Sequence, residues 1–127
     1  HDFESKTKRK QFTEKGKLVG QYEKLLMDDL LKKASLVQFG KYKVLALNSS
    51  IKKFASALGR ALMERRNPLG IVWYVEGNDI HVSLRGDETV DVGKLAAQFP
   101  GGGGHPRAAG FTASLSKGFP WRVLESK

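Results

Sequence analysis

The residues best suited to binding a ligand are four consecutive glycines and a histidine, Gly101 to His105. Adjacent glycines are costly in a folded domain, because glycine loses more backbone freedom on folding than any other residue. They also tolerate positive φ angles, and without a Cβ their N–H groups can approach an anion closely. Segments with the periodicity of a helix and of a strand lie close to the run on either side, which favours an ordered loop over a flexible linker. The run therefore predicts a backbone cradle for a phosphate group.

Two side chains could contribute to the same chemistry. His105 can donate a hydrogen bond from a ring nitrogen, and Arg85 can make a bidentate contact with a phosphate or a carboxylate. The alternatives are a structural histidine and a surface ion pair of Arg85 with Asp87 or Glu88. The glycine run matches neither the lysine-containing phosphate loop nor the dinucleotide-binding fingerprint, because it lacks their Lys-Ser/Thr pair and their strand-to-helix context.

The sequence offers no clear arrangement for catalysis. It has no cysteine, and its three histidines, His1, His81 and His105, do not have the spacing of a zinc site. The aspartates do not cluster into a two-metal site, and no G-x-S-x-G motif is present. Composition and spacing alone thus indicate a phosphate-binding module without a reaction centre of its own.

The net charge of +9 is confined to the first half of the chain. Residues 1–66 contain 16 Lys and Arg against 7 Asp and Glu, whereas residues 67–127 contain 6 of each class. A concentrated basic surface attracts phosphate-rich partners through sequence-independent electrostatics. Solvated helix faces have the same composition, so both interpretations stay open. The lysines that would follow a polynucleotide are Lys17, Lys24, Lys32 and Lys33.

Length and composition indicate one folded domain. A chain of 127 residues with 40% hydrophobic and 28% charged residues can bury a core and is too apolar to be disordered. The absence of cysteine favours a reducing compartment. The longest stretch without a charge, residues 95–106, includes four glycines and is too short to span a bilayer. We therefore expect a cytoplasmic protein without membrane contact, and the start at His1 suggests a piece of a longer protein.

Hydrophobic periodicity indicates which elements occupy the first half. Apolar residues at intervals of three and four predict an amphipathic helix over residues 14–37, and residues 42–47 predict a buried strand. A second helix is expected after Ser49 or Ser50, either of which can cap it, and Asn67-Pro68 is expected to end it. Its predicted core face consists of Ile51, Phe54, Ala55, Leu58, Ala61 and Leu62.

The second half predicts the elements that hold the glycine run. Residues 71–76 and 79–85 predict two strands joined by a tight turn at Gly77-Asn78. Asp91 is expected to cap a short helix, and residues 109–115 alternate as a last strand. Period two places three polar residues of the second strand on one face: His81, Ser83 and Arg85. Together these elements predict an α/β (α+β) domain with a mixed sheet of about four to five strands.

The combined motifs resemble the C-terminal, DHH-associated domain of DHH-family phosphoesterases. That pattern is a strand ending in Ser83-Leu84-Arg85, a short helix, the glycines with His105, and Ala108-Ala109-Gly110-Phe111. The resemblance covers roughly residues 42–116. Pro100 departs from the pattern at the entrance to the loop, where four glycines follow it.

The resemblance implies a substrate-recognition domain separated from its enzyme. In that family an N-terminal domain holds manganese through aspartates and an Asp-His-His motif, and this chain has no adjacent Asp-His-His. Members include exonucleases, short-RNA-degrading enzymes, cyclic dinucleotide phosphodiesterases and exopolyphosphatase-related proteins. By position, Arg85 and His105 resemble substrate-phosphate contacts, and Gly102, Gly103 and Gly104 resemble the backbone cradle. No catalytic residue, metal ligand or cofactor is expected in this chain itself.

The same resemblance implies how the chain is divided into segments and which partners it binds. Residues 1–15 would be a basic segment, residues 16–40 a connector helix, and residues 41–127 the substrate-binding domain. The partners would be a nucleotide, a short RNA or single-stranded nucleic acid, and the DHH domain of the same polypeptide. Alternatives are the tRNA-binding C-terminal module of an alanyl-tRNA synthetase and a free-standing nucleic-acid-binding domain. Ser83-Leu84-Arg85 and His105 favour the phosphoesterase, and the sequence upstream of His1 would separate the three.

Overall fold

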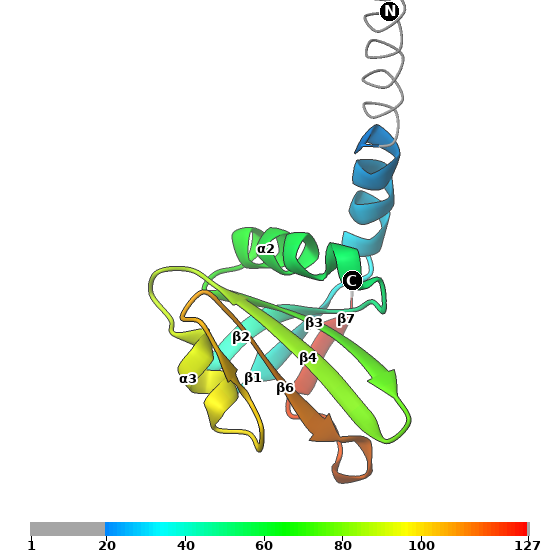
Figure 1. Ribbon diagram of the computed structural model, residues 1–127. Helices are drawn as coiled ribbons and strands as arrows, with labels where there is room; N and C mark the ends of the chain where they lie inside the picture. Colours follow the sequence, from blue (N-terminus) through cyan, green and yellow to red (C-terminus); the bar gives the residue numbers. More distant parts are fainter. Residues whose placement is uncertain (1–19, 127) are drawn as a thin grey trace, which may run out of the picture.

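A twisted sheet with helices on both faces forms the domain, shown in a computed structural model that describes residues 20–126 (Figure 1). The sheet has seven strands in the order β5-β6-β4-β3-β2-β1-β7. Strands β2 and β3 pair in parallel, and the other pairs of the described sheet are antiparallel. The strands are β1 (Ser35–Phe39), β2 (Tyr42–Asn48), β3 (Leu69–Glu76), β4 (Asp79–Gly86), β5 (Gly103–Gly104), β6 (Ala108–Ser114) and β7 (Arg122–Ser126).

The helices alternate with these strands along the chain. Residues 20–31 are helical and lead into β1. A 3₁₀ turn, η1 (Lys52–Phe54), continues directly into α2 (Ala55–Arg65). The short helix α3 (Val92–Ala97) precedes the glycine run, and a second 3₁₀ turn, η2 (Leu115–Lys117), follows β6. None of the helices in the described part of the chain has the length and apolar character needed to cross a membrane.

The α+β class with a mixed sheet is confirmed, but the predicted count of four to five strands is wrong. The sequence prediction missed β1, β5 and β7. Strand β1 begins within the predicted helix over residues 14–37, and the described helix already ends at residue 31. Gly40, with a φ of 59°, reverses the chain so that Phe39 pairs with Tyr42. This pairing fixes β1 as an extended segment despite its helix-compatible spacing.

Helix α2 packs on one face of the sheet as its apolar spacing predicts. Leu58 and Leu62 are fully buried and pack with Leu45 and Val72. Of the other predicted core positions, Phe54 is buried, Ala55 and Ala61 are half-buried, and Ile51 is exposed. The helix ends before Asn67-Pro68, as predicted, but its N-terminus has no side-chain cap. The Ser49 hydroxyl accepts from the Ile51 N–H instead, at 3.4 Å.

Two glycines bring α2 close to the sheet. A Cβ on Gly70 of β3 would lie 2.5 Å from the carbonyl oxygen of Gly59 and 2.8 Å from the amide nitrogen of Met63. A Cβ on Gly59 would lie 2.9 Å from the Cγ of Arg85. The absence of both Cβ atoms thus lets the helix sit directly over β3 and over the aliphatic stem of Arg85.

Helix α3 covers part of the opposite face, where the larger core lies. Its buried residues Val92 and Ala96 pack with the apolar residues of β4 and with Phe111 of β6. The rings of Phe99 and Phe111 stack with a centroid separation of 3.9 Å. The predicted cap is confirmed, because the Asp91 carboxylate accepts from the Lys94 N–H at 3.0 Å. Helix α3 and the glycine run that follows it are thereby fixed beside β6.

Candidate phosphate-binding site

The polar residues of β4 lie on the α2 face of the sheet, as their alternation predicts. Ile80, Val82 and Leu84 are buried in the core on the α3 side. The residues between them are half-buried or exposed. Arg85 pairs with Ala108 of β6, and Ser83 pairs with Gly110. Because paired residues of antiparallel strands point to the same side, small residues of β6 flank the polar row of β4.

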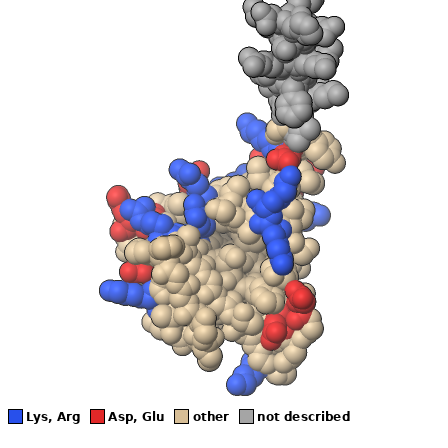
Figure 2. Space-filling model, viewed as in Figure 1, with Lys and Arg blue, Asp and Glu red and all other residues tan. Residues whose placement is uncertain are grey.

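A shallow hollow of about 260 Å³ lies between this polar row and the beginning of α2. Its lining contains two cations, two serine hydroxyl groups and no carboxylate. The residues are Lys52, Ala55, Ser56, Ser83, Leu84, Arg85, Ala108 and Ala109. In the space-filling view, basic side chains with some acidic ones among them lie next to α2, above a broad uncharged area over the strands (Figure 2). Charge and hydrogen-bond donors therefore converge on a space that suits an anion.

Arg85 is half-buried and has no anionic partner within residues 20–126. The ion pairs of the described chain are Lys32–Asp29, Lys53–Glu23 and Arg60–Glu64. The alternative ion pair of Arg85 with Asp87 or Glu88 is not formed among them. Gly59 lies against the aliphatic stem of Arg85, which restricts where the guanidinium can go. A partly desolvated guanidinium without a carboxylate is suited to bidentate binding of an oxyanion.

The carboxylate of Asp87, next to the site, is hydrogen-bonded within its own loop. Its carboxylate accepts hydrogen bonds from the hydroxyl and the N–H of Thr89. These two bonds, and to a smaller extent the charge of Arg107, lower the pKa of Asp87 below its usual value. The Asp87 N–H in turn donates to the carbonyl oxygen of Pro68 at 2.9 Å. The carboxylate nearest in sequence to Arg85 is therefore held by its own loop.

The beginning of α2 adds a favourable electrostatic field to the hollow. Lys52, Ala55 and Ser56 belong to the first turns of the η1–α2 segment. No side chain caps α2, and its first turn contains no acidic residue. The partial positive charge of a helix N-terminus, roughly half an elementary charge, favours an anion there. The site thus combines Arg85 with a lysine, two serines and the beginning of a helix that no side chain caps.

The glycine run lies beside this hollow and does not line it. The Gly102 N–H donates to the carbonyl oxygen of Phe99 at 3.0 Å, so it is already used within the loop. A Cβ on Gly102 would overlap the carbonyl oxygen of Ala96, and one on Gly104 would lie 2.6 Å from the Cα of Ala109. Gly102 and Gly104 are therefore needed for packing. A Cβ on Gly103 would meet nothing within 4 Å, so this residue faces open space.

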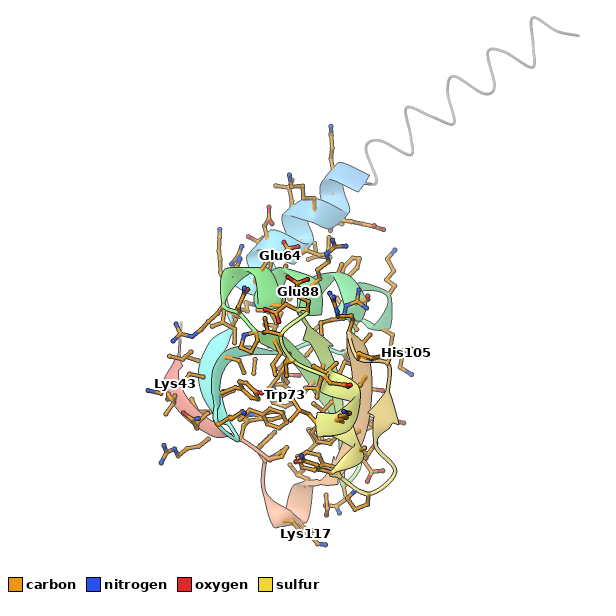
Figure 3. The ribbon with its side chains drawn as sticks, turned by 90° about the vertical axis from the view of Figure 1, so that its left-hand side faces the viewer. Lys43, Glu64, Trp73, Glu88, His105 and Lys117 are labelled. Atoms are coloured by element: carbon orange, nitrogen blue, oxygen red, sulfur yellow. The ribbon has the colours of Figure 1, made fainter. Side chains whose placement is uncertain are left out.

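His105 lies at the rim formed by the β5–β6 edge, on the far side of the sheet from Lys43 (Figure 3). Its N–H donates to the carbonyl oxygen of Ala108 at 2.8 Å, and the Ala108 N–H donates back at 3.3 Å. Ala108 in turn pairs with Arg85. Two strand spacings, about 10 Å, therefore separate the backbones of Arg85 and His105. The structure places Arg85 in the hollow and leaves His105 and the glycines outside its lining.

Lys52 and Ser56 line the hollow but were not predicted from the sequence as site residues. Both belong to a segment whose spacing describes a surface helix, and no motif marks them. Gly59 and Gly70 signal a close helix–strand approach, but the sequence does not show which strands the helix crosses. Of the predicted lysines on the first helix, Lys24, Lys32 and Lys33 are exposed. Lys17 lies outside the described residues.

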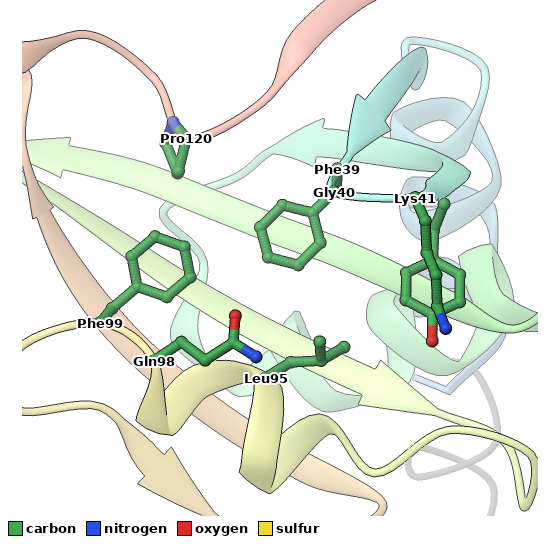
Figure 4. A pocket seen from close by; sticks show the side chains of 8 residues that line it. Phe39, Gly40, Lys41, Leu95, Gln98, Phe99 and Pro120 are labelled. Atoms are coloured by element: carbon green, nitrogen blue, oxygen red, sulfur yellow. The ribbon is translucent and has the colours of Figure 1, made fainter.

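A larger hollow of about 540 Å³ lies on the α3 side of the sheet (Figure 4). Its lining is mainly aromatic and aliphatic, with Phe39, Tyr42, Leu95 and Phe99. Lys41 is its one cation, and its ammonium group lies 5.4 Å from the centroid of the Tyr42 ring. This apolar hollow lacks the converging donors that an anion requires. Within residues 20–126, no group of three His, Cys, Asp or Glu residues could hold a metal ion.

Comparison with protein families gives a match to the DHHA1 domain over residues 40–120. The chain belongs to the DHHA1 domain family. It is thus the DHH-associated domain that its motifs resemble, and the match includes β4, α3, the glycine run and β6. No curated protein matches the chain significantly.

Two solved structures share the DHHA1 fold with this chain. An uncharacterized protein from Helicobacter pylori G27 has 26% sequence identity and a TM-score of 0.51 over 67% of this chain and 23% of its own. The pGpG-specific phosphodiesterase PggH from Vibrio cholerae has 14% identity and a TM-score of 0.53 over 83% of this chain and 38% of its own. The DHHA1 domain described here therefore spans less than half of each of these proteins.

Proposed function

We propose that this DHHA1 domain is the substrate-recognition domain of a DHH-family phosphoesterase and holds a phosphate of a nucleotide or short nucleic acid. The observation that carries the proposal is the carboxylate-free hollow around Arg85. There, the half-buried Arg85 has no anionic partner within residues 20–126 and lines the hollow together with Lys52, Ser56 and Ser83. Family membership and the phosphodiesterase among its structural neighbours support the same function.

Each group in the hollow has a distinct role in the proposed binding. Arg85 donates two parallel hydrogen bonds to a phosphate and supplies a positive charge. Lys52 adds a second positive charge, and the hydroxyl groups of Ser56 and Ser83 donate single hydrogen bonds. Gly103 and His105 contact the same nucleotide from the rim, where the open side of Gly103 allows close approach of a ligand.

In this proposal a DHH domain of the same polypeptide catalyses the hydrolysis. That domain would supply the manganese ions that activate water and stabilise the developing charge. The described residues contribute binding and orientation of the substrate only. We therefore expect the purified 127-residue chain to bind phosphodiesters without hydrolysing them. Manganese-dependent turnover that persists through rigorous removal of contaminating nucleases would contradict this assignment.

Replacement of Arg85 tests the proposal. Arg85→Met keeps an unbranched apolar stem against Gly59 while it removes the charge, so the fold should persist. Loss of a hydrogen-bonded charge should weaken binding of a 5′-phosphorylated dinucleotide by about 1.5–3 kcal/mol, or roughly 10- to 150-fold in Kd. Arg60→Met is the matched control, because Arg60 is an exposed α2 residue paired with Glu64. Equal affinities of the wild type and Arg85→Met by calorimetry would refute the proposed site.

A further inference from the structure

An aromatic pair lies on the same face of the sheet as Arg85. The rings of Tyr74 on β3 and His81 on β4 stack with centroids 4.8 Å apart and an interplanar angle of 16°. The two residues are direct cross-strand partners. Both are half-buried, and neither belongs to a hydrophobic core cluster of the described chain. Packing of the core therefore does not explain why two stacked rings stand at this position.

The pair is connected to the hollow by Lys52. The ammonium group of Lys52 lies 6.0 Å from the centroid of the Tyr74 ring, and Lys52 also lines the hollow around Arg85. His81, Ser83 and Arg85 follow one another along the same face of β4. The rings, the lysine and the guanidinium thus form one continuous surface.

The neighbouring strand leaves the space beside this row open. On β6, His81 pairs with Thr112, Ser83 with Gly110 and Arg85 with Ala108. Because Ala108 and Thr112 have small side chains and Gly110 has none, the surface over β6 is lower than the surface over the larger side chains of β4. A flat ring can therefore lie over β6 and against the imidazole of His81. No hydrogen bond engages the Tyr74 hydroxyl or the His81 ring within residues 20–126, so both are available to a ligand.

We propose that Tyr74 and His81 form a stacking platform for a nucleobase of the ligand whose phosphate occupies the Arg85 hollow. This inference rests on the proposed function and narrows its ligand from any nucleotide or short nucleic acid to one long enough to place a base on His81 and a phosphate at Arg85. A rise of about 3.3 Å per residue places the Cα atoms of His81 and Arg85 roughly 13 Å apart along β4. That separation exceeds the reach of one nucleoside and suits a dinucleotide or a longer strand.

The test compares ligands that differ only in their bases. Binding of a 5′-phosphorylated diadenylate and of its abasic counterpart is measured by calorimetry for the wild type and for Tyr74→Ala/His81→Ala. Base–aromatic stacking predicts about ten-fold tighter binding of the diadenylate by the wild type. The double variant should lose this ten-fold preference and bind the abasic ligand as the wild type does. Tyr74→Phe should retain the preference, because it keeps the ring and removes only the hydroxyl.

The control variant is Tyr22→Ala, which removes a tyrosine that is 68% exposed on the first helix. It should leave the affinity for both ligands unchanged. If the double variant keeps its preference for the diadenylate and Arg85→Met weakens the binding of both ligands, the platform is wrong and the phosphate site is still supported. An equal loss for both ligands in the double variant would overturn the platform as well, because stacking acts only on the base. If Arg85→Met affects neither ligand, the proposed function and the platform both fail.

Discussion

Replacement of Gly70 by alanine tests whether the close approach of α2 builds the site. The added Cβ would lie 2.5 Å from the Gly59 carbonyl oxygen, whereas ordinary van der Waals contact begins at 3.4 Å. The overlap of 0.9 Å involves backbone atoms of α2, which cannot turn aside as a side chain can. The helix as a whole must therefore withdraw from β3.

The expected cost follows from what the withdrawal disrupts. Overpacking of a well-packed core costs about 1–3 kcal/mol, and α2 holds the fully buried Leu58 and Leu62 against β3. For a domain of this size the loss corresponds to a decrease in Tm of roughly 4–12 °C. Withdrawal also moves Lys52 and Ser56 away from Arg85. We therefore expect weaker nucleotide binding even at temperatures where the variant is fully folded.

Urea denaturation followed by circular dichroism measures the effect. The midpoint should decrease while the m value stays constant, because the native fold and its surface are otherwise retained. Gly20→Ala is the control, since a Cβ at Gly20 would meet nothing within 4 Å and should not destabilise the protein. If Gly70→Ala unfolds at the wild-type urea concentration, the reasoning about the helix–strand contact is wrong.

Three further predictions concern the loops and the charged surface. Thr89→Val should raise the pKa of Asp87 in an NMR titration, because the variant loses the hydroxyl hydrogen bond that contributes most to lowering this pKa. In the wild type the lowered pKa stabilises the fold above pH about 4, and this stabilisation is lost as the pH falls through the pKa of the folded state. Gly102→Ala should destabilise the loop by overlap with Ala96. A Cβ on Gly103 meets no atom within 4 Å, so Gly103→Val should lower the melting temperature only through its φ of 157°, and it should weaken nucleotide binding while the variant is folded; a folded Gly103→Val variant that binds as the wild type does would reject a role of Gly103 at the rim. The association constant for single-stranded nucleic acid should fall as the salt concentration rises, with a log–log slope of about 0.7 per neutralised phosphate; a constant affinity would show that Lys24, Lys32 and Lys33 are ordinary solvated surface lysines.

Features encoded within a few neighbouring residues could be predicted from the sequence. Alternation along residues 79–85 correctly placed His81, Ser83 and Arg85 on one face. The turn at Gly77 has a φ of 64°, and Asp91 caps α3, because both arrangements depend on local backbone chemistry. The core face of the η1–α2 segment followed from its spacing for Phe54, Leu58 and Leu62.

Features that depend on distant pairing could not be predicted in this way. Strand β7 pairs with β1 from the other end of the described chain, and its Val123 is 61% exposed, so no buried pattern marks it. Strand β5 consists of two glycines and forms because β6 lies beside it. The residues of β1 fit a helical spacing as well as a strand, and pairing with β2 decides between them.

The residues of the candidate site also differ in whether local sequence patterns could identify them. Arg85 carried a motif and a strand position, so its chemistry was visible in the sequence. Lys52 and Ser56 reach the hollow because α2 crosses β3 and approaches β4, which no local pattern specifies. The cradle predicted for Gly102 to Gly104 stays a prediction. Local sequence patterns do not show that the Gly102 N–H donates to the Phe99 carbonyl oxygen within the loop.

The central claim is that the hollow around Arg85 receives the phosphate of the ligand. Amide chemical-shift changes in a ¹⁵N-labelled chain, titrated with a 5′-phosphorylated dinucleotide, locate the ligand directly. The account predicts the largest changes at Ser56, Ser83, Arg85 and Ala108, with smaller ones at Gly103 and His105. Changes confined to the apolar hollow of Phe39, Tyr42 and Phe99, or absent at saturating ligand, would contradict it.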